Sequence, residues 1–197
     1  MRPARAARDG NERVAGGDVS YSTVSFSGWS NQTRISLMVR RYAMDIIHLV
    51  TDVAASSGSK TTPVVTIRIN GRRLVDLIRD VELSSALHEG HANLAGAYVG
   101  IPPMVAFLPS RHLLGEPAAG WDWQPEAVPV LQCECGEPGC WPLLVCIAIG
   151  SETVTWSDFR QPHRGPQSPA GHWRYDALPG FTFDRRQYEE ALRPQSR

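Results

Sequence analysis

The stretch "VPVLQCECGEPGCWPLLVCIAIGSETVTWSDF", residues 128–159, decides the fold class because it holds three short apolar segments separated by turn residues. The segments are Val128–Cys133, Trp141–Ile149 and Thr153–Phe159. Their valine, isoleucine and aromatic side chains favour strands, and the glycine and proline residues between them are typical of tight turns. The stretch therefore predicts a β-meander of successive antiparallel strands.

Upstream, "VVTIRINGRRLVDLIRDVEL" (residues 64–83) predicts a strand, a turn and a helix in that order. Val65 and Ile67 alternate with polar residues, as they do in a strand with one buried face. The pair Asn70-Gly71 suits a turn that needs positive φ angles. Apolar residues then recur at helical spacing from Leu74 onward, so an amphipathic helix follows directly.

Downstream, "FTFDRRQYEEALR" (residues 181–193) predicts a short strand that leads into a helix capped by Asp184. Tyr188 and Leu192 are expected to face the sheet. "MVAFLP" (residues 104–109) is expected to be another short strand. Strands and helices in this order favour an α+β fold, an antiparallel sheet with a few short helices packed on one face.

The first 62 residues differ in composition from the rest and are expected to form a poorly ordered, loosely attached extension. One helix is predicted within it, over residues 33–55, because Ile35, Ile46, Leu49 and Val53 lie at helical spacing. "SSGSKTTP" (residues 56–63) has the composition of a linker. Residues 63–193 are therefore predicted to form the single α+β domain.

The charge and the hydropathy of the chain argue against two classes of partner, nucleic acids and membranes. The chain carries 20 basic and 20 acidic residues, so its formal net charge is zero, and no nucleic-acid partner is expected. The most apolar stretch, residues 35–50, is interrupted by Arg40, Arg41, Asp45 and His48, so no membrane association is expected. The sequence favours a cytoplasmic protein whose partner, if it has one, is another protein.

Three of the four cysteines lie within eight positions, in the pattern Cys133-x-Cys135-x4-Cys140. Two cysteines one residue apart on a strand point to the same side, and the glycines and proline of the turn can bring the third back toward them. In a reducing compartment such a cluster favours metal or redox chemistry over a structural disulfide. We therefore predict a zinc site built from these three thiolates, completed by His163 or His172 from the loop that follows.

Two alternatives to zinc remain open. Cys135 and Cys140 can instead form a reversible disulfide in a thiol-dependent redox enzyme or sensor, or the cysteines can simply pack in the hairpin. An iron–sulfur cluster would need Cys146, which lies six residues beyond Cys140 on an extended strand between apolar neighbours. We expect Cys146 to be a buried core thiol instead.

No sequence pattern decides whether the protein is an enzyme. "HEGH" (residues 88–91) lacks the spacing of a zinc-protease helix, so Glu89 is expected to lie in a solvated loop. There is no serine nucleophile motif and no glycine-rich phosphate loop.

Three longer motifs carry a resemblance. "CECGEPGCWPLL", "VTWSDFRQPHR" and "FTFDRRQYEEAL" together resemble a group of uncharacterised bacterial proteins, over residues 64–193. The resemblance implies the same domain limits and a cytoplasmic location, and it implies no activity. The sequence alone thus favours a binding or interaction domain with a cysteine-rich, zinc-stabilised hairpin, with the thiol redox protein as the alternative.

Overall fold

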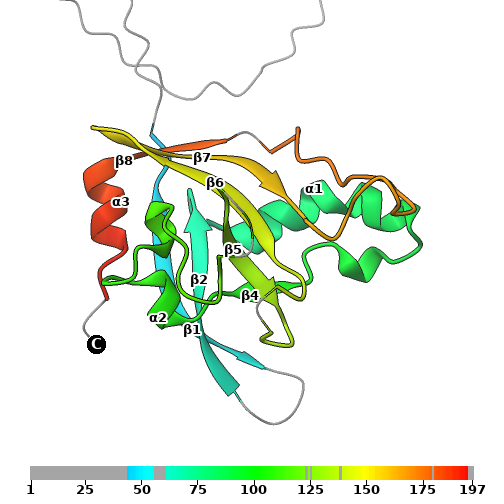
Figure 1. Cartoon of the computed structure of the whole chain (residues 1–197), viewed down its shortest axis with the longest axis horizontal. Helices are drawn as coiled ribbons and strands as arrows, with labels where there is room; N and C mark the ends of the chain where they lie inside the picture. The colour runs from blue at the N-terminus through cyan, green and yellow to red at the C-terminus, as the bar shows by residue number, and fades with distance from the viewer. Residues whose placement is uncertain are drawn as a thin grey trace, which may run out of the picture. The chain divides into compact units, whose positions relative to one another are not determined.

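The structure is a computed structural model that describes residues 44–55, 61–122, 124, 126–137, 139–178 and 180–194. These residues form eight strands in two antiparallel sheets, three α-helices and two short 3-10 helices, which confirms the predicted α+β class (Figure 1). No helix in this part of the chain is long and apolar enough to cross a membrane.

The first sheet has the order β1 (Ile47–Ala55), β2 (Thr61–Ile69) and β3 (Arg72–Arg73). The second sheet follows chain order, with β4 (Tyr98–Gly100), β5 (Val128–Cys133), β6 (Leu143–Ile149), β7 (Thr153–Arg160) and β8 (Phe181–Asp184). The meander predicted from residues 128–159 is therefore confirmed as β5, β6 and β7.

The helices are α1 (Leu74–His88), α2 (Pro103–Ala106) and α3 (Arg185–Ala191), and the 3-10 helices are η1 (Ala92–Leu94) and η2 (His112–Leu114). The turn before β3 is the predicted one, because Asn70 and Gly71 adopt φ angles of 51° and 82°. Asp184 caps α3, since its Oδ1 accepts a hydrogen bond from the backbone N of Gln187 at 2.9 Å.

The two sheets are joined at both ends, so the strands enclose one core. At one junction the backbone N of Val65 donates to the carbonyl of Ile101 at 2.8 Å, and at the other Asp45 pairs in parallel with Phe183. Gly100 makes the first junction possible, because a Cβ atom there would lie 2.0 Å from the carbonyl oxygen of Val65.

Apolar side chains from both sheets and from α1 and α3 fill the interior. The bulkiest of them are fully buried, with at most 1% exposure: Ile47, Ile67, Ile78, Leu143, Trp156, Phe183 and Tyr188. Trp156 Nε1 donates to the Tyr188 hydroxyl at 3.0 Å, and that hydroxyl donates to the carbonyl of Leu113 at 2.6 Å. The predicted placement of Tyr188 and Leu192 against the sheet is confirmed, since both are fully buried.

The predicted helix over residues 33–55 is wrong where the structure describes it, because Ile47–Ala55 is strand β1. β1 pairs with β2 over nine residues, and its buried side chains alternate at Ile47 and Leu49, whereas Val53 is 60% exposed. The apolar residues of this segment fit the period of a helix as well as that of a strand. The segment is a strand because it pairs with β2. Residues 33–43 of the predicted helix lie outside the described residues.

Two further expectations need correction. The predicted domain boundary at residue 63 falls inside β2, and the compact unit begins at Met44. The segment expected as a strand at residues 104–109 instead begins with helix α2, in which Pro103 occupies the first turn, where a missing N–H costs nothing.

Candidate metal centre

The cysteine-rich turn connects the end of β5 to the start of β6. The backbone N of Gly136 donates to the carbonyl of Cys133 at 3.0 Å, and the backbone N of Cys140 donates to the carbonyl of Glu137 at 3.2 Å. Gly136 and Gly139 both adopt a φ of 81°, a conformation that other residues rarely adopt. These two reversals bring the chain back so that Cys140 faces the end of β5, as the sequence predicted.

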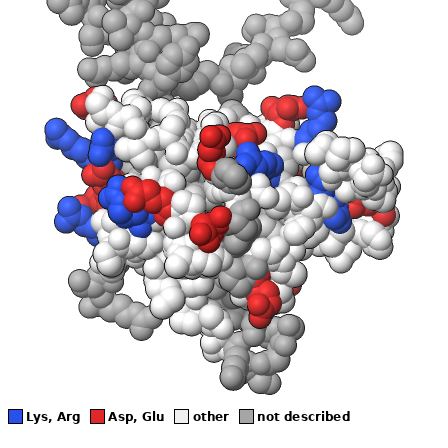
Figure 2. Space-filling view, viewed as in Figure 1, with Lys and Arg blue, Asp and Glu red and all other residues white. Residues whose placement is uncertain are grey.

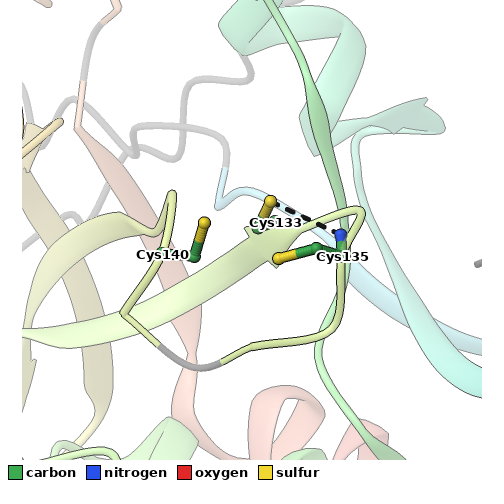
Figure 3. A group of neighbouring side chains, drawn as sticks. All are labelled: Cys133, Cys135 and Cys140. Atoms are coloured by element: carbon green, nitrogen blue, oxygen red, sulfur yellow. Dashed lines mark hydrogen bonds between the residues drawn. The ribbon is translucent and has the colours of Figure 1, made fainter. Parts of the chain in front are cut away.

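The three thiols of Cys133, Cys135 and Cys140 converge on one space beside the turn (Figure 3). Their sulfur atoms all lie within 4.8 Å of one another, and the backbone N of Cys135 donates to Cys133 Sγ at 3.4 Å. Sulfurs bound tetrahedrally to zinc at about 2.3 Å lie about 3.8 Å apart. To hold a zinc ion, the thiols therefore need to approach one another by no more than about 1 Å, which side-chain rotation can supply.

The thiols differ in acidity. Burial raises the pKa of Cys133 to about 12, because its half-buried sulfur loses the water that would stabilise a thiolate. The pKa of Cys135 is lowered, mainly because the Cys133 thiol donates a hydrogen bond to it. Cys135 and Cys140 are exposed. An incoming cation thus meets an accessible thiol at Cys135, which releases its proton more readily than an ordinary cysteine does, and displaces a tightly held proton from Cys133.

Cys146 lies apart from this group. Its Sγ donates to Asp158 Oδ2 at 3.5 Å, and Asp158 forms an ion pair with Arg160. Burial raises the pKa of this thiol, although the side chain is half-buried rather than enclosed in the core. Cys146 was correctly set apart from the cluster, but its expected place in the core is wrong.

Of the two histidines predicted as ligands, His163 contacts the turn. Its Nε2 lies 2.7 Å from the carbonyl oxygen of Gly139, and its ring stacks on Trp141 with 6.3 Å between centroids. His172 instead places Nδ1 3.1 Å from the carbonyl oxygen of Arg164. Among the described residues, the group of donor atoms within 4.8 Å of one another contains the three thiols and neither imidazole.

Known proteins offer no parallel from which to assign this site. No protein-family model, curated protein or solved structure matches the chain.

An ion pair with a buried carboxylate lies next to Trp141, and local sequence patterns do not indicate it. Glu89, expected in a solvated loop, has a side chain only 3% exposed, and its Oε2 lies 3.0 Å from Nε of Arg164. Trp173 Nε1 donates to the other carboxylate oxygen at 2.8 Å. The Arg164 guanidinium lies 4.5 Å from the ring centroid of Trp141 and 5.2 Å from that of Trp173. Because Glu89 and Arg164 lie 75 residues apart, no local pattern signals this contact.

A second buried carboxylate fixes the loop that carries His163. Glu82 on α1 accepts hydrogen bonds from the hydroxyls of Tyr98 and Tyr175, both at 2.6 Å, and from the backbone N of Gly96 at 2.9 Å. Burial raises the pKa of Glu82. All three donors to the Glu82 carboxylate belong to the protein, so this hydrogen-bond network holds α1, β4 and the loop before β8 together.

Proposed function

We propose that this protein is a binding domain whose cysteine-rich hairpin is stabilised by one zinc ion, held by the thiolates of Cys133, Cys135 and Cys140. The observation that carries the proposal is the convergence of the three sulfurs within 4.8 Å of one another. Zinc is the metal that thiolate-rich structural sites most often hold. In this proposal the metal supports the fold and the protein acts on a partner by binding it.

The turn has a physical need for such support. Cys135, Gly136 and Glu137 are exposed, and the described residues of the turn share two backbone hydrogen bonds, from Gly136 to Cys133 and from Cys140 to Glu137. A metal that joins Cys133 and Cys140 connects the end of β5 to the residues just before β6. Because the ligands come together only in the folded chain, metal binding adds to the stability of the hairpin.

The surface charge supports a protein partner over a nucleic acid. On the face shown in Figure 2, basic and acidic side chains are interspersed, and the formal net charge of the chain is zero. Nucleic-acid binding draws on clustered positive charge that releases counterions from phosphates. The proposal includes a cytoplasmic location, because that compartment keeps thiols reduced.

Metal analysis of untagged protein tests the proposal. We expect about one equivalent of zinc per chain, and less than about a tenth of an equivalent would contradict it. Cys135→Ser should abolish stoichiometric binding, because it removes the exposed thiol of lowered pKa. Cys146→Ser is the matched control, since Cys146 contacts Asp158 outside the group, and it should bind metal as the wild type does.

A thiol redox protein is the second candidate, and the lowered pKa of the exposed Cys135 favours it. In this case the Cys135 thiolate attacks hydrogen peroxide, releases hydroxide and becomes a sulfenic acid. Cys140 then displaces water to form the disulfide, so that two electrons pass to the peroxide. Mass spectrometry after mild peroxide should show a bridge between these two cysteines, and a chelator should leave the fold intact. Unlinked thiols after peroxide would exclude this candidate.

A further inference from the structure

We infer that Nδ1 of His163 is the fourth ligand of the metal, held in the right tautomer by the carbonyl group of Gly139. The inference rests on the proposed metal-binding function and specifies which atom completes the coordination shell. It also assigns a role to Gly139, as the group that orients a ligand without touching the metal.

The position of the imidazole is the first argument. The Gly139 carbonyl belongs to the peptide bond that precedes Cys140, and His163 Nε2 lies 2.7 Å from its oxygen. The same ring stacks on Trp141, the residue that follows Cys140, with an interplanar angle of 13°. His163 thus contacts both chain neighbours of one thiol ligand, so its ring stays beside Cys140 when the turn contracts around a metal.

The tautomer is the second argument. A carbonyl oxygen only accepts hydrogen bonds, so the contact with Gly139 requires a proton on Nε2 of His163. In the neutral ring the lone pair then lies on Nδ1, which is the form able to bind a metal. Metal-binding histidines commonly donate their other ring N–H to a carbonyl or carboxylate in this way.

The backbone that carries His163 is fixed from the interior. Its N–H donates to Oε1 of Gln161 at 3.0 Å, and Gln161, only 3% exposed, donates from Nε2 to the Tyr98 hydroxyl at 3.2 Å. On the other side, Arg164 forms the buried ion pair with Glu89. A ligand whose own N–H and whose following residue are both held in this way loses little freedom on binding, which favours it as a donor.

His172 is the other histidine predicted as a ligand, and its contacts are with residues of its own loop and not with the cysteine-rich turn. Its Nδ1 bonds to the carbonyl of Arg164, and its ring lies 3.8 Å from where a Cβ atom on Gly165 would be. These contacts hold His172 on its own loop, whereas those of His163 reach the residues on either side of Cys140.

Cobalt substitution tests the assignment. Co(II) bound by three thiolates and one imidazole absorbs strongly in the visible region, and the band positions change when a ligand is exchanged. We expect His163→Ala to shift these bands and to raise the Kd for Co(II) at least about tenfold. His172→Ala should leave the bands in place and the Kd within about twofold. Bands and Kd unchanged in His163→Ala, or changed in His172→Ala, would overturn the inference.

A measurement on the unmodified chain covers the case in which His163→Ala fails to fold. In protein loaded with cadmium-113 and labelled with nitrogen-15 on histidine, Nδ1 of His163 should show scalar coupling to the metal. Coupling at His172, or at neither ring, would overturn the inference while leaving the three thiolates in place. Failure of the wild type to bind Co(II) or Cd(II) at all would instead overturn the proposed metal-binding function, and the inference with it.

Discussion

Arg164 and Glu89, 75 residues apart in the chain, form an ion pair in which Nε lies 3.0 Å from Oε2 and the Glu89 side chain is only 3% exposed. Arg164 also lies over the ring of Trp141, which follows Cys140. This pair therefore anchors the cysteine-rich turn to the residue that directly follows α1.

Removal of Glu89 should be costly. Glu89→Ala leaves Arg164 partly buried without its partner and Trp173 Nε1 without an acceptor, so we expect a loss of about 3 kcal/mol in the free energy of unfolding. Asp80→Ala is the control, because it breaks the exposed Arg72–Asp80 pair and should cost less than about 1 kcal/mol. Urea unfolding measures both, and equal losses would contradict the role given to Glu89.

The junction between the sheets should tolerate no side chain at residue 100. In Gly100→Ala the new Cβ would meet the carbonyl oxygen of Val65 at 2.0 Å, so the strands must separate. We expect a loss of about 3 kcal/mol in the free energy of unfolding. At Gly165 a Cβ would meet only His172, at 3.8 Å, so Gly165→Ala should change stability by less than about 1 kcal/mol. A Gly100→Ala protein as stable as Gly165→Ala would show that the sheets are not joined there.

Stability should fall in mild acid because of His112. This fully buried ring has Nε2 2.7 Å from the carbonyl of Pro129 and Nδ1 accepting from the backbone N of Ala118, and burial lowers its pKa. A lowered folded-state pKa means that its stabilising contribution is present above about pH 6.5 and is lost as the pH falls below that value.

Urea unfolding between about pH 8 and about pH 5 checks this dependence. In His112→Gln the protein should be less stable at neutral pH, and its stability should change less over the same interval. A variant with the same pH dependence as the wild type would assign the loss to other groups.

Metal affinity should rise with pH. Because the pKa of Cys133 is raised to about 12, this thiol carries a proton at neutral pH and must release it on metal binding. Each proton released changes the apparent Kd about tenfold per pH unit. Isothermal titration in buffers of different ionisation enthalpy counts these protons. We expect at least about one per zinc ion, and a Kd independent of pH would argue against thiolate ligands.

Local sequence patterns predicted the elements whose contacts are local. The meander of β5, β6 and β7, the turn at Asn70-Gly71 and the cap at Asp184 each follow from residues within a few positions of one another. The sequence predicts a helix where β1 lies, because the apolar residues there fit both the helical and the strand period. Pairing with β2 decides in favour of the strand. Its identity depends on a tertiary contact, which outweighs local propensity.

The candidate site divides in the same way. The convergence of Cys133, Cys135 and Cys140 follows from a glycine-driven turn, and local spacing predicted it. The ion pair of Arg164 with Glu89 joins distant segments, and nothing in either local sequence indicates it. The spacing of the cysteines indicates which chemistry the thiols can perform, whereas the contacts that hold the turn in place depend on the tertiary fold.

X-ray absorption at the zinc edge of the loaded protein tests the central claim most directly, because it identifies the ligand atoms and their distances from the metal. We predict about three sulfur atoms at about 2.3 Å and one nitrogen at about 2.0 Å. A first shell made only of nitrogen and oxygen, or one with a single sulfur, would contradict the claim that Cys133, Cys135 and Cys140 bind one metal ion together.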